Sequence, residues 1–464
     1  MSFGPVSPGD HPVIAEGIIS RGAWALIEDK FSDFAKKTLA NVVHFVINDC
    51  IPAAEVYEAQ ISKDPSTRWK VVPPVIEELK AKAKSLGLWN LFLSKKHYPD
   101  VGSPLTNLEY AVMAEVTGRG GHFASEALNC SAPDTGNMEV LAKYGNEEQK
   151  KQWLTPLLNG EIRSAFAMTE RFIASSDATN IKTDIRQEGD EIVINGHKWW
   201  ISGAGDPRCK LHILMGKSDP NNSSPHKQQS IVLIPADTPG IRVVRAMQVF
   251  GYDDAPEGHC EIIYENVRVP LKNLVKGWGC GFEIIQGRLG PGRIHHCMRS
   301  IGTAEAALDR MLTRATDTRK RTFGKALYEH GTIVADIAKS RMQIDQARLL
   351  VLSAANMIDR SNAKGAMRDI GMSKVVVPTM ALEVVDRSMQ AHGAEGICQD
   401  TPLAAAYAGL RTLRYADGPD EVHIQQIGKQ ELKRAKLLWE RQESVEKKSQ
   451  KHLSNAGIKP RSHL

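Results

Sequence analysis

Apolar residues recur at helical spacing through the first third of the chain. The series from Leu39 to Val46 places them at i, i+3, i+4 and i+7, and a second series from Ile76 to Leu86 follows the dipeptide Pro73–Pro74. Such a recurrence forms one apolar stripe on a helix, and proline is well tolerated in a first helical turn. The pattern predicts that residues 1 to about 160 are mainly α-helical.

The pattern changes to short β-rich runs in the middle of the chain. These runs are EIVINGHKWWISG (191–203), SIVLIPA (230–236), IRVVRAMQVF (241–250) and CEIIYENVRVP (260–270), with turn residues between them. The dipeptide Asn195–Gly196 is typical of a hairpin turn, so we expect the chain to reverse there. The polar segment DPNNSSPHK (219–227) predicts an exposed loop within this β domain.

Helical periodicity returns from Gly281 onward. One long seam has the spacing of a helix that packs against partners, and it consists of Ile344, Ala347, Val351, Ala354 and Ile358. The chain is therefore expected to end in an α-helical bundle. No internal repeat of 20 to 50 residues is visible, which argues against a solenoid or a propeller.

Composition and charge exclude several classes of protein. The 464 residues are 42% hydrophobic and 24% charged, which is ordinary for a packed chain and unlike disordered or fibrous proteins. The net charge of +5 is too small at this length to indicate a nucleic-acid partner, and the basic surplus from Lys433 to Lys459 is interpreted as a solvated helix end. No run approaches the roughly 18 apolar residues of a membrane-spanning helix.

Cysteine usage and the first residues bear on the cellular compartment. The seven cysteines are odd in number, widely spread and without a Cys-x-x-Cys pair, which favours a reducing compartment over a disulfide framework or a zinc ribbon. The first residues, MSFGPVSPGDHPV, carry neither a basic and apolar signal nor an Arg-rich amphipathic pattern. We therefore expect neither secretion nor a mitochondrial presequence.

Two segments around the predicted β domain carry candidate cofactor chemistry. In GEIRSAFAMTERFIASSD (160–177), Thr169, Ser175 and Ser176 could bind a flavin edge or a phosphate, although such a segment is also typical of a turn. In the run Lys198–Ser202, the pair Trp199–Trp200 precedes a hydroxyl. This arrangement suits a cofactor wall and also suits core packing.

A third segment, GRLGPGRIHHC (287–297), places a cation at an expected helix start after Pro291–Gly292. Arg293 could bind an anionic substrate group or pair with a carboxylate. Adjacent helix residues point about 100° apart, so His295, His296 and Cys297 cannot converge on one ion as consecutive ligands. We therefore expect no metal site here.

Three further segments lie in the predicted bundle. RKRTFGK (319–325) places three cations before a Phe-Gly pair, which suits phosphate recognition or an exposed helix end. QAHGAEGI (390–397) supplies Gly393 and Gly396, where a backbone can approach a ligand or a helix can stop. YADGPDEVH (415–423) gathers the carboxylates of Asp417, Asp420 and Glu421, which suits acid–base catalysis or a turn.

The order of these segments resembles the acyl-CoA dehydrogenase family from end to end. The matching strings are AMTERFIASSD, WWIS, RLGPGR, TFGK, QxHGAxG and ADGPDEVH, and GRLGPGRIHHCMR (287–299) is similar to the peroxisomal-type branch of family members ten and eleven. The resemblance implies an α+β fold with an N-terminal α-helical domain (1–163), a middle β-barrel domain (164–277), a C-terminal four-helix bundle (278–445) and a tail (446–464).

The resemblance also implies an FAD cofactor, held between the β domain and the bundle, and an acyl-CoA substrate. The positions that correspond to cofactor contacts around the β domain are Phe166, Met168, Thr169, Ser176, Trp200 and Ser202. Those that correspond to contacts from a neighbouring subunit are Phe323, Gln390, Gly393 and Ala394, and those that resemble the adenosine-binding segment are Pro419, Asp420 and Glu421. Arg319 and Lys320 correspond to cofactor contacts at the pyrophosphate. The positions that correspond to substrate contacts are Ser176, Arg293 and Gly418.

Two departures from the family pattern matter. Lys320 stands where the family commonly has arginine, so the pyrophosphate contact passes to Arg319 or Arg321 or becomes a weaker point-charge contact. Asp417 stands where the usual base is glutamate, and its side chain is shorter by about 1.5 Å. Aspartate is what the branch of members ten and eleven has, so we expect a shifted substrate pose rather than lost activity. Other branches place the base at the position of Gly292, which excludes that alternative here.

The activity implied is α,β-dehydrogenation of an acyl-CoA in fatty-acid β-oxidation, with Asp417 removing the α-proton while a hydride passes to flavin N5. The alternatives are a flavin oxidase on the same fold, either an acyl-CoA oxidase or a nitroalkane-oxidase-like enzyme, and a non-catalytic nucleic-acid-binding relative, which the small net charge disfavours. The electron acceptor is accordingly an electron-transfer flavoprotein or oxygen, and the expected assembly is a homodimer or homotetramer. The ending Ser462–His463–Leu464 is similar to the Ser-Lys-Leu address and predicts a peroxisomal enzyme, with the mitochondrion as the alternative.

Overall fold

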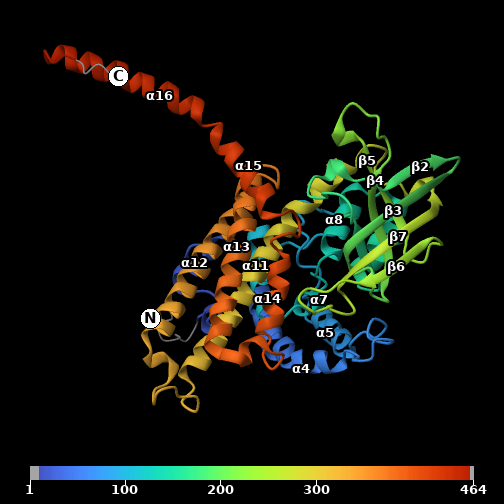
Figure 1. The fold of residues 1–464 in the computed structure, drawn as a ribbon, viewed down its shortest axis with the longest axis horizontal. Coiled ribbons are helices and arrows are strands. Elements are labelled where there is room, and N and C mark those ends of the chain that lie inside the picture. Colours follow the sequence, from blue (N-terminus) through green and yellow to red (C-terminus); the bar gives the residue numbers. More distant parts are fainter. Residues whose placement is uncertain (1–9, 460–464) are drawn as a thin grey trace.

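Helices make up both ends of the chain and a β-sheet makes up its middle in the computed structural model, which describes residues 10–459 (Figure 1). The predicted address Ser462–Leu464 therefore lies outside the described residues. The succession of helical, β and helical parts that the hydrophobic pattern predicts is confirmed. Within residues 10–459, every helix lacks the combination of length and apolar character that crossing a membrane requires.

The N-terminal part is a group of helices packed around α6. This helix is buried from Asn107 to Gly118, so neighbouring elements surround it. α5 begins at Pro74, as the sequence predicts. The helices are α1 (Pro12–Ala15), α2 (Arg21–Ala25), α3 (Asp33–Phe45), α4 (Ile51–Gln60), α5 (Pro74–Ser85), α6 (Asn107–Arg119), α7 (Ala124–Ala127), α8 (Asp134–Tyr144), α9 (Glu147–Gln149) and α10 (Thr155–Asn159). Two π-helical turns, η2 (Val46–Cys50) and η3 (Lys150–Leu154), join α3 to α4 and α9 to α10.

The middle part is a seven-stranded sheet with the strand order β1-β4-β2-β3-β7-β6, in which β5 also pairs with β4. β1 and β2 run parallel to β4, and the other pairs are antiparallel. The polar segment 219–227 connects β4 to β5, as predicted. The strands are β1 (Arg163–Ala167), β2 (Asp184–Glu188), β3 (Glu191–Ser202), β4 (Cys209–Lys217), β5 (Gln229–Pro235), β6 (Ile241–Ala246) and β7 (His259–Pro270).

The predicted hairpin turn at Asn195–Gly196 is wrong. β3 runs through this dipeptide, and the chain reverses earlier, at Gly189–Asp190 between β2 and β3. The strand continues because β7 pairs with it on its other side from Glu191 to Ser202. Gly196 permits a close approach instead, since a Cβ at this position would lie 2.3 Å from Thr183 Oγ1.

The C-terminal part is a bundle of helices beside the sheet (Figure 1). The predicted seam of α12, from Ile344 to Ile358, is buried. The helices are α11 (Gly281–Thr316), α12 (Gly331–Arg360), α13 (Met367–His392), α14 (Leu403–Thr412), α15 (Asp420–Leu432) and α16 (Ala435–Asn455). Short 3-10 turns complete the elements, namely η1 (Glu28–Lys30), η4 (Ala178–Asn180), η5 (Pro225–Lys227), η6 (Leu271–Asn273), η7 (Leu327–Glu329) and η8 (Gly393–Ile397).

The longest helix, α11, begins at Gly281, so the predicted helix start after Pro291–Gly292 is wrong. An interior proline costs a main-chain hydrogen bond. The helix continues nevertheless because its apolar face is buried on both sides of this point, at Ile284 before it and at Ile294 and Met298 after it. Tertiary burial outweighs the local preference here.

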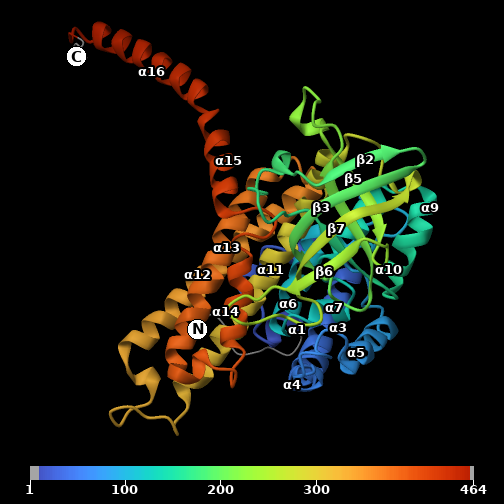
Figure 2. The ribbon, with the colours of Figure 1, turned by 45° about the vertical axis from the view of Figure 1, so that its right-hand side comes forward.

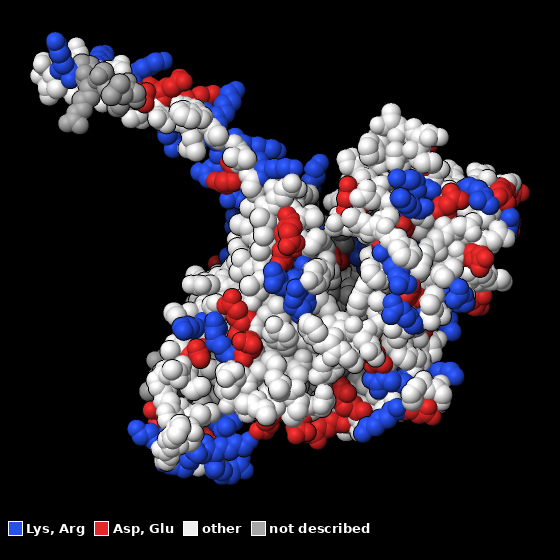
Figure 3. Space-filling model, in the orientation of Figure 1, with Lys and Arg blue, Asp and Glu red and all other residues white. Residues whose placement is uncertain are grey.

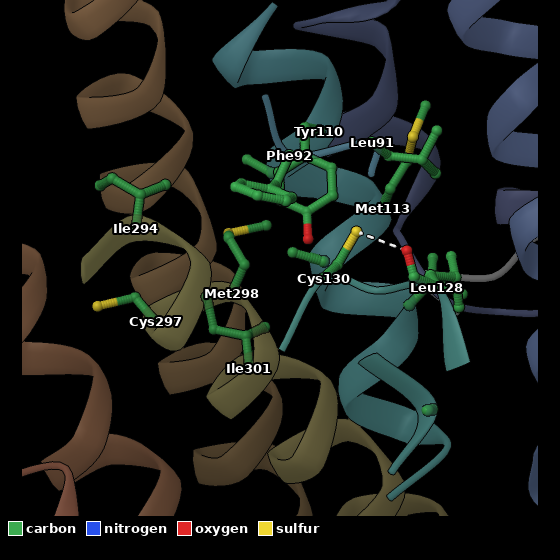
Figure 4. Packing of buried hydrophobic residues seen from close by; sticks show 14 of the residues in the cluster. Leu91, Phe92, Tyr110, Met113, Leu128, Cys130, Ile294, Cys297, Met298 and Ile301 are labelled. Atoms are coloured by element: carbon green, nitrogen blue, oxygen red, sulfur yellow. Dashed lines mark hydrogen bonds between the residues drawn. The ribbon is translucent and has the colours of Figure 1, made fainter. Parts of the chain in front are cut away.

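Figure 4 shows how α11 packs against the N-terminal helices. Met298 and Ile301 on α11 lie beside Tyr110 and Cys130, and all four are buried. The Cys130 thiol donates to the Leu128 carbonyl at 3.2 Å, so its polar atom is satisfied within this apolar cluster. This packing fixes the position of α11, whose other face carries the basic side chains described below.

The last helix, α16, projects from the body in both ribbon views (Figures 1 and 2). It has no buried residue. The interpretation of the basic surplus as a solvated helix end is therefore confirmed for the described part of this segment.

Candidate active site

Asp417, the predicted base, lies in the connection from α14 to α15. Its side chain is 19% exposed. Its φ of +57° is left-handed, and Gly418 follows with a φ of +105°. A left-handed non-glycine residue costs free energy and is concentrated at functional sites, although aspartate tolerates it better than most residues.

Basic side chains and a histidine surround the Asp417 carboxylate. Arg288 Nη1 lies 4.0 Å from Oδ1, and His296 Nε2 lies 3.6 Å from Oδ2. Arg293 Nε donates to the Asp417 main-chain carbonyl at 3.0 Å. Lys374 on α13 is buried and donates to the main-chain carbonyl that follows α14. Four side chains that can carry positive charge thus lie around Asp417, and two of them are within 4.0 Å of its carboxylate oxygens.

These charges hold Asp417 in its ionised form. Burial raises the pKa of its carboxyl, but His296, together with the guanidinium groups of Arg288 and Arg293 and the Lys374 ammonium, outweighs burial, and the pKa lies below its ordinary value. Burial and the Arg299 guanidinium lower the pKa of His296 to about 3, so its imidazole is neutral at physiological pH. The arrangement supplies an ionised carboxylate that can accept a proton.

Arg288 on α11 links the bundle to the β domain. The molecular surface is hollowed between these two parts (Figure 3). The Arg288 guanidinium carbon lies 4.2 Å from the ring centroid of Phe166 on β1, while its Nη1 faces Asp417. Its Nε is buried without a hydrogen-bond partner. Gly136 leaves room for it, since a Cβ there would lie 2.8 Å from that nitrogen. A buried donor without a partner points to an acceptor on a ligand.

A second cluster lies at the end of β3. Trp200 is 36% exposed, has a φ of +55°, and stands where the register of β3 against β7 shifts. Two residues further on, Ser202 Oγ is hydrogen-bonded to His259 Nδ1 at 2.8 Å. Two hydrogen bonds to main-chain carbonyls join β3 to the segment after β1. The Lys198 side-chain Nζ donates to the Met168 carbonyl at 2.7 Å, and the Trp199 main-chain amide donates to the Thr169 carbonyl at 3.1 Å.

Comparisons with known proteins identify the family of this arrangement. Three family models match, namely the acyl-CoA dehydrogenase N-terminal domain at residues 32–161, its middle domain at 165–267 and its C-terminal domain at 279–432. The chain belongs to the acyl-CoA dehydrogenase family.

The relatives differ from this chain in length. Acyl-CoA dehydrogenase family member 10 of Mus musculus is 52% identical over 424 residues, which are 91% of this chain and 39% of that protein. Family member 11 of Gallus gallus is 51% identical over 400 residues, 86% of this chain and 50% of that protein. The chain thus spans two fifths to one half of these relatives. A solved acyl-CoA dehydrogenase from Mycobacterium abscessus has 47% identity and a TM-score of 0.82, covering 87% of this chain and 99% of that one.

FAD is the cofactor of this family, and the cluster at the end of β3 fits a flavin. Phe166 and Met168 are partly buried and Trp200 is exposed, and all three offer apolar surface, while Thr169 and Ser202 supply hydroxyls. A flat ring system edged with nitrogen and oxygen atoms needs this combination of apolar wall and a few polar contacts. The structure therefore brings five of the predicted flavin residues to one place. Their roles as contacts stay predictions.

The residues expected to contact FAD from a neighbouring subunit, and those expected at its pyrophosphate, lie at the other end of the bundle. Arg319, Lys320 and Phe323 are in the connection from α11 to α12, and Lys320 forms an ion pair with Glu395 in η8, which also holds Gly393 and Ala394. Gln390 lies in the last turn of α13. Asp417 follows α14 near the start of α13, and a helix of 26 residues spans about 39 Å. One chain does not bring these two groups together.

Three predicted residues lie at the N-terminal end of α15, and one lies in a loop. Pro419 precedes the helix, and Asp420 in its first turn is buried and accepts from Arg414 Nε at 2.6 Å, which leaves Oδ1 without a partner. Glu421 is exposed, and so is Ser176 in the loop after β1. Within residues 10–459, no group of three or more His, Cys, Asp and Glu side chains is placed to hold a metal ion.

Sequence reasoning missed four side chains near Asp417 or Ser202, and one of them, Lys374 on α13, stands outside the quoted motifs. Arg288 stands inside a quoted motif, but only its distance from Asp417 distinguishes it from a surface arginine. The motif that contains His296 suggests it only as a candidate metal ligand, and His259 lies in a strand without any motif. One backbone signal does agree with the motifs, since Trp200 and Asp417, both predicted site residues, have positive φ values.

Proposed function

We propose that this protein dehydrogenates an acyl-CoA thioester between its α and β carbons in fatty-acid β-oxidation, with Asp417 as the base. The observation that carries the proposal is the Asp417 carboxylate, ionised, held in a left-handed backbone and linked through Arg288 to the flavin-fitting cluster of the β domain. The family membership gives the reaction class, and the positions of these residues support their roles.

The chain's own residues would hold the substrate and take its α-proton. An acyl thioester α-proton is weakly acidic, so its removal needs a fixed base in line with the breaking C–H bond. Arg293 holds the Asp417 main chain through the carbonyl, and Arg288 offers an unpartnered Nε to an acceptor on the ligand. FAD, when bound, supplies the acceptor for the β-hydride.

The second candidate is a flavin oxidase on the same fold. One observation favours it, because the base position holds aspartate, as in the nitroalkane-oxidase-like alternative, rather than the glutamate usual in dehydrogenases. The two functions differ in the electron acceptor. A dehydrogenase needs an electron-transfer partner, whereas an oxidase consumes one oxygen per substrate, so an oxygen electrode with the FAD-loaded protein and acyl-CoA distinguishes them.

The test of the proposal is anaerobic bleaching of the bound flavin by a panel of acyl-CoAs of different chain length and branching. At least one of them should reduce the flavin of the wild-type protein. Asp417→Asn keeps the size of the side chain but removes the carboxylate, so FAD and acyl-CoA should still bind while reduction slows by about 10²- to 10⁴-fold. A wild-type flavin that no acyl-CoA bleaches, or an Asp417→Asn variant reduced at the wild-type rate, contradicts the proposal.

A further inference from the structure

His296 is a polar side chain in the candidate active site that the proposed mechanism leaves without a role. It lies on α11 three residues after Arg293, and its Nε2 is 3.6 Å from Asp417 Oδ2. The preceding residue, His295, faces elsewhere, with its ring 4.7 Å from the ring of Tyr110 in the apolar cluster. Two adjacent histidines therefore have different surroundings, and only one of them contacts the proposed base.

The tautomer of His296 follows from its second neighbour. His296 Nδ1 lies 3.3 Å from Arg299 Nη2, one turn further along α11. A guanidinium has only N–H donors, so Nδ1 must accept, and in the neutral ring the hydrogen is assigned to Nε2. Burial and Arg299 keep the ring neutral. Nε2–H thus points toward the carboxylate of Asp417.

We propose that His296 is a positioning residue for the base: Arg299 fixes the His296 tautomer, and His296 Nε2–H holds Oδ2 of Asp417 so that Oδ1 faces the substrate. The inference rests on the proposed function, in which Asp417 is the base. The 3.6 Å separation exceeds hydrogen-bond range, and a shift of about 0.5 Å closes it to a hydrogen bond, as contacts at catalytic groups commonly do when substrate binds.

A neutral hydrogen-bond donor can orient the Asp417 carboxylate without the loss of basicity that a paired cation would cause. A guanidinium paired directly with Asp417 would strongly stabilise the carboxylate and so weaken it as a base. Aspartate also has a short side chain, so a small rotation moves its oxygen away from the substrate carbon, and a misplacement of about 1 Å can cost 10²-fold in rate. A neutral imidazole can fix the orientation at a smaller cost in basicity.

The other groups that act on Asp417 do not replace His296. Arg288 faces Oδ1 at 4.0 Å, Arg293 bonds the main chain rather than the carboxylate, and Lys374 bonds a carbonyl at the end of α14. The thiol of Cys297 and the imidazole of His423 are neutral, because burial raises the pKa of the former to about 12 and lowers that of the latter to about 4. Asp420, the remaining acid nearby, is paired with Arg414.

The test compares His296→Leu, which removes the donor, with His296→Gln, which keeps an amide N–H at similar reach. His296→Leu should slow anaerobic flavin reduction at saturating acyl-CoA by about 10- to 100-fold, with KM little changed. The acid limb of its kcat/KM profile should move to higher pH, because the carboxylate has lost a donor that favours its ionised form. His296→Gln should recover most of the rate and return the acid limb toward wild type.

His295→Leu is the matched control, because it replaces the adjacent histidine on α11, which is buried and faces Tyr110 rather than Asp417. It should leave the reduction rate and the acid limb at their wild-type values, even where it lowers the melting temperature. An His296→Leu enzyme with wild-type rate and acid limb overturns the inference, and so does a His295→Leu enzyme that shows the same losses.

A second measurement separates this inference from the proposed function. In the FAD-loaded protein labelled with ¹⁵N-histidine, His296 should show Nε2 protonated and Nδ1 unprotonated, and its Nε2 signal should shift in Asp417→Asn. These results support the contact even if no acyl-CoA bleaches the wild-type flavin, an outcome that refutes the function alone. A His296 ring protonated at Nδ1 rejects the inference whatever the activity.

Discussion

Glu139 on α8 is a buried carboxyl close enough to Arg288 to act on its charge. The side chain is 3% exposed, and burial raises its pKa to about 8, although Arg288 and Lys143 act in the opposite direction. Glu139 is thus largely protonated near neutral pH. A neutral Glu139 leaves the positive charge of Arg288 uncompensated on that side, which helps to keep Asp417 ionised.

The raised pKa predicts a specific dependence of stability on pH. Its value in the folded protein lies above the roughly 4.3 of an unfolded glutamate. The folded state therefore binds the proton more tightly, and this contribution to stability, complete below about pH 4.3, is lost as pH rises to 8. Relative to Glu139→Gln, the wild-type protein should lose up to about 1.4 kcal/mol of unfolding free energy per pH unit in this range.

Urea unfolding of both proteins at several values between pH 5 and pH 8 measures this difference. The Gln variant shares the shape of the glutamic acid and cannot ionise, so the comparison isolates one proton. Parallel stability profiles for the two proteins would show that Glu139 titrates near its ordinary pKa and leaves Arg288 partly neutralised.

At the scale of residues, the motifs predicted site residues that lie close together in the sequence. They did not predict contacts between residues that are distant in the sequence. Asp417 stands in a string specific enough to be matched by position, and the structure places basic groups around it. His295 and His296 have different surroundings, as expected for adjacent residues that diverge on a helix. Helix geometry alone does not show that His296 meets Asp417, because 120 intervening residues determine that contact.

At the scale of elements, a close crossing of α6 and α11 fixes the helix that carries Arg288, Arg293 and His296. A Cβ on Gly118 of α6 would lie 2.1 Å from the Arg299 carbonyl oxygen, and one on Gly302 of α11 would lie 2.0 Å from the Glu115 carbonyl oxygen. The two backbones can approach this closely only because both positions are glycine. The crossing therefore couples the N-terminal core to the candidate active site.

Gly118→Ala should push α6 and α11 apart. Overpacking of this kind typically costs about 1–3 kcal/mol of unfolding free energy. The added methyl group would clash with the main-chain carbonyl of Arg299 on α11, the helix that carries Arg288 and His296. Flavin reduction by acyl-CoA should therefore slow as well. Gly409→Ala on the exposed side of α14 is the control, because no atom lies within 4 Å of its added Cβ. Its stability should be unchanged or slightly higher. Equal melting temperatures for the two variants would mean that the crossing tolerates a methyl group.

The two wrong predictions about elements have a common cause. Asn195–Gly196 is a turn dipeptide and Pro291–Gly292 is a helix-start dipeptide by local preference, yet β3 and α11 run through them. In each case a long-range partner decides: β7 pairs with β3, and the N-terminal core buries both halves of α11. Where local and tertiary preferences agree, as at Pro74 and along α12, the sequence predicts the element correctly.

At the scale of the whole molecule, most of the predicted FAD contacts form two separate groups, one in the β domain and one at the end of the bundle where α11 connects to α12. The end that holds Arg319, Lys320 and Phe323 also exposes large apolar side chains, with Phe323 95% and Ile397 67% exposed. Exposed apolar surface of this kind commonly marks a contact with another chain. A second copy that brings its Phe323 end to the Trp200 cluster of the first would complete a site that neither chain contains alone.

Subunit complementation tests this arrangement. One variant carries Trp200→Ala with Ser202→Ala, and the other carries Phe323→Ala with Gln390→Ala, so each should bind FAD poorly when purified alone. If each site takes one group from each chain, a mixed pair has one site with all four changes and one site with none. Random pairing on co-expression should then restore about one quarter of the wild-type FAD content, because half of the pairs are mixed and half of their sites are intact.

The control is the same two proteins purified separately and combined without subunit exchange, which should hold no more FAD than either alone. In a second control, a chain that carries all four substitutions is co-expressed with the wild-type chain. In its mixed pairs, every site takes one altered group of residues from the variant chain. Only pairs of two wild-type chains then bind FAD fully, and these hold about one quarter of the sites. The decisive comparison is between the two double variants with and without exchange. Recovery that depends on exchange requires a site shared between chains, whereas FAD content equal in both cases places all of the contacts within one chain.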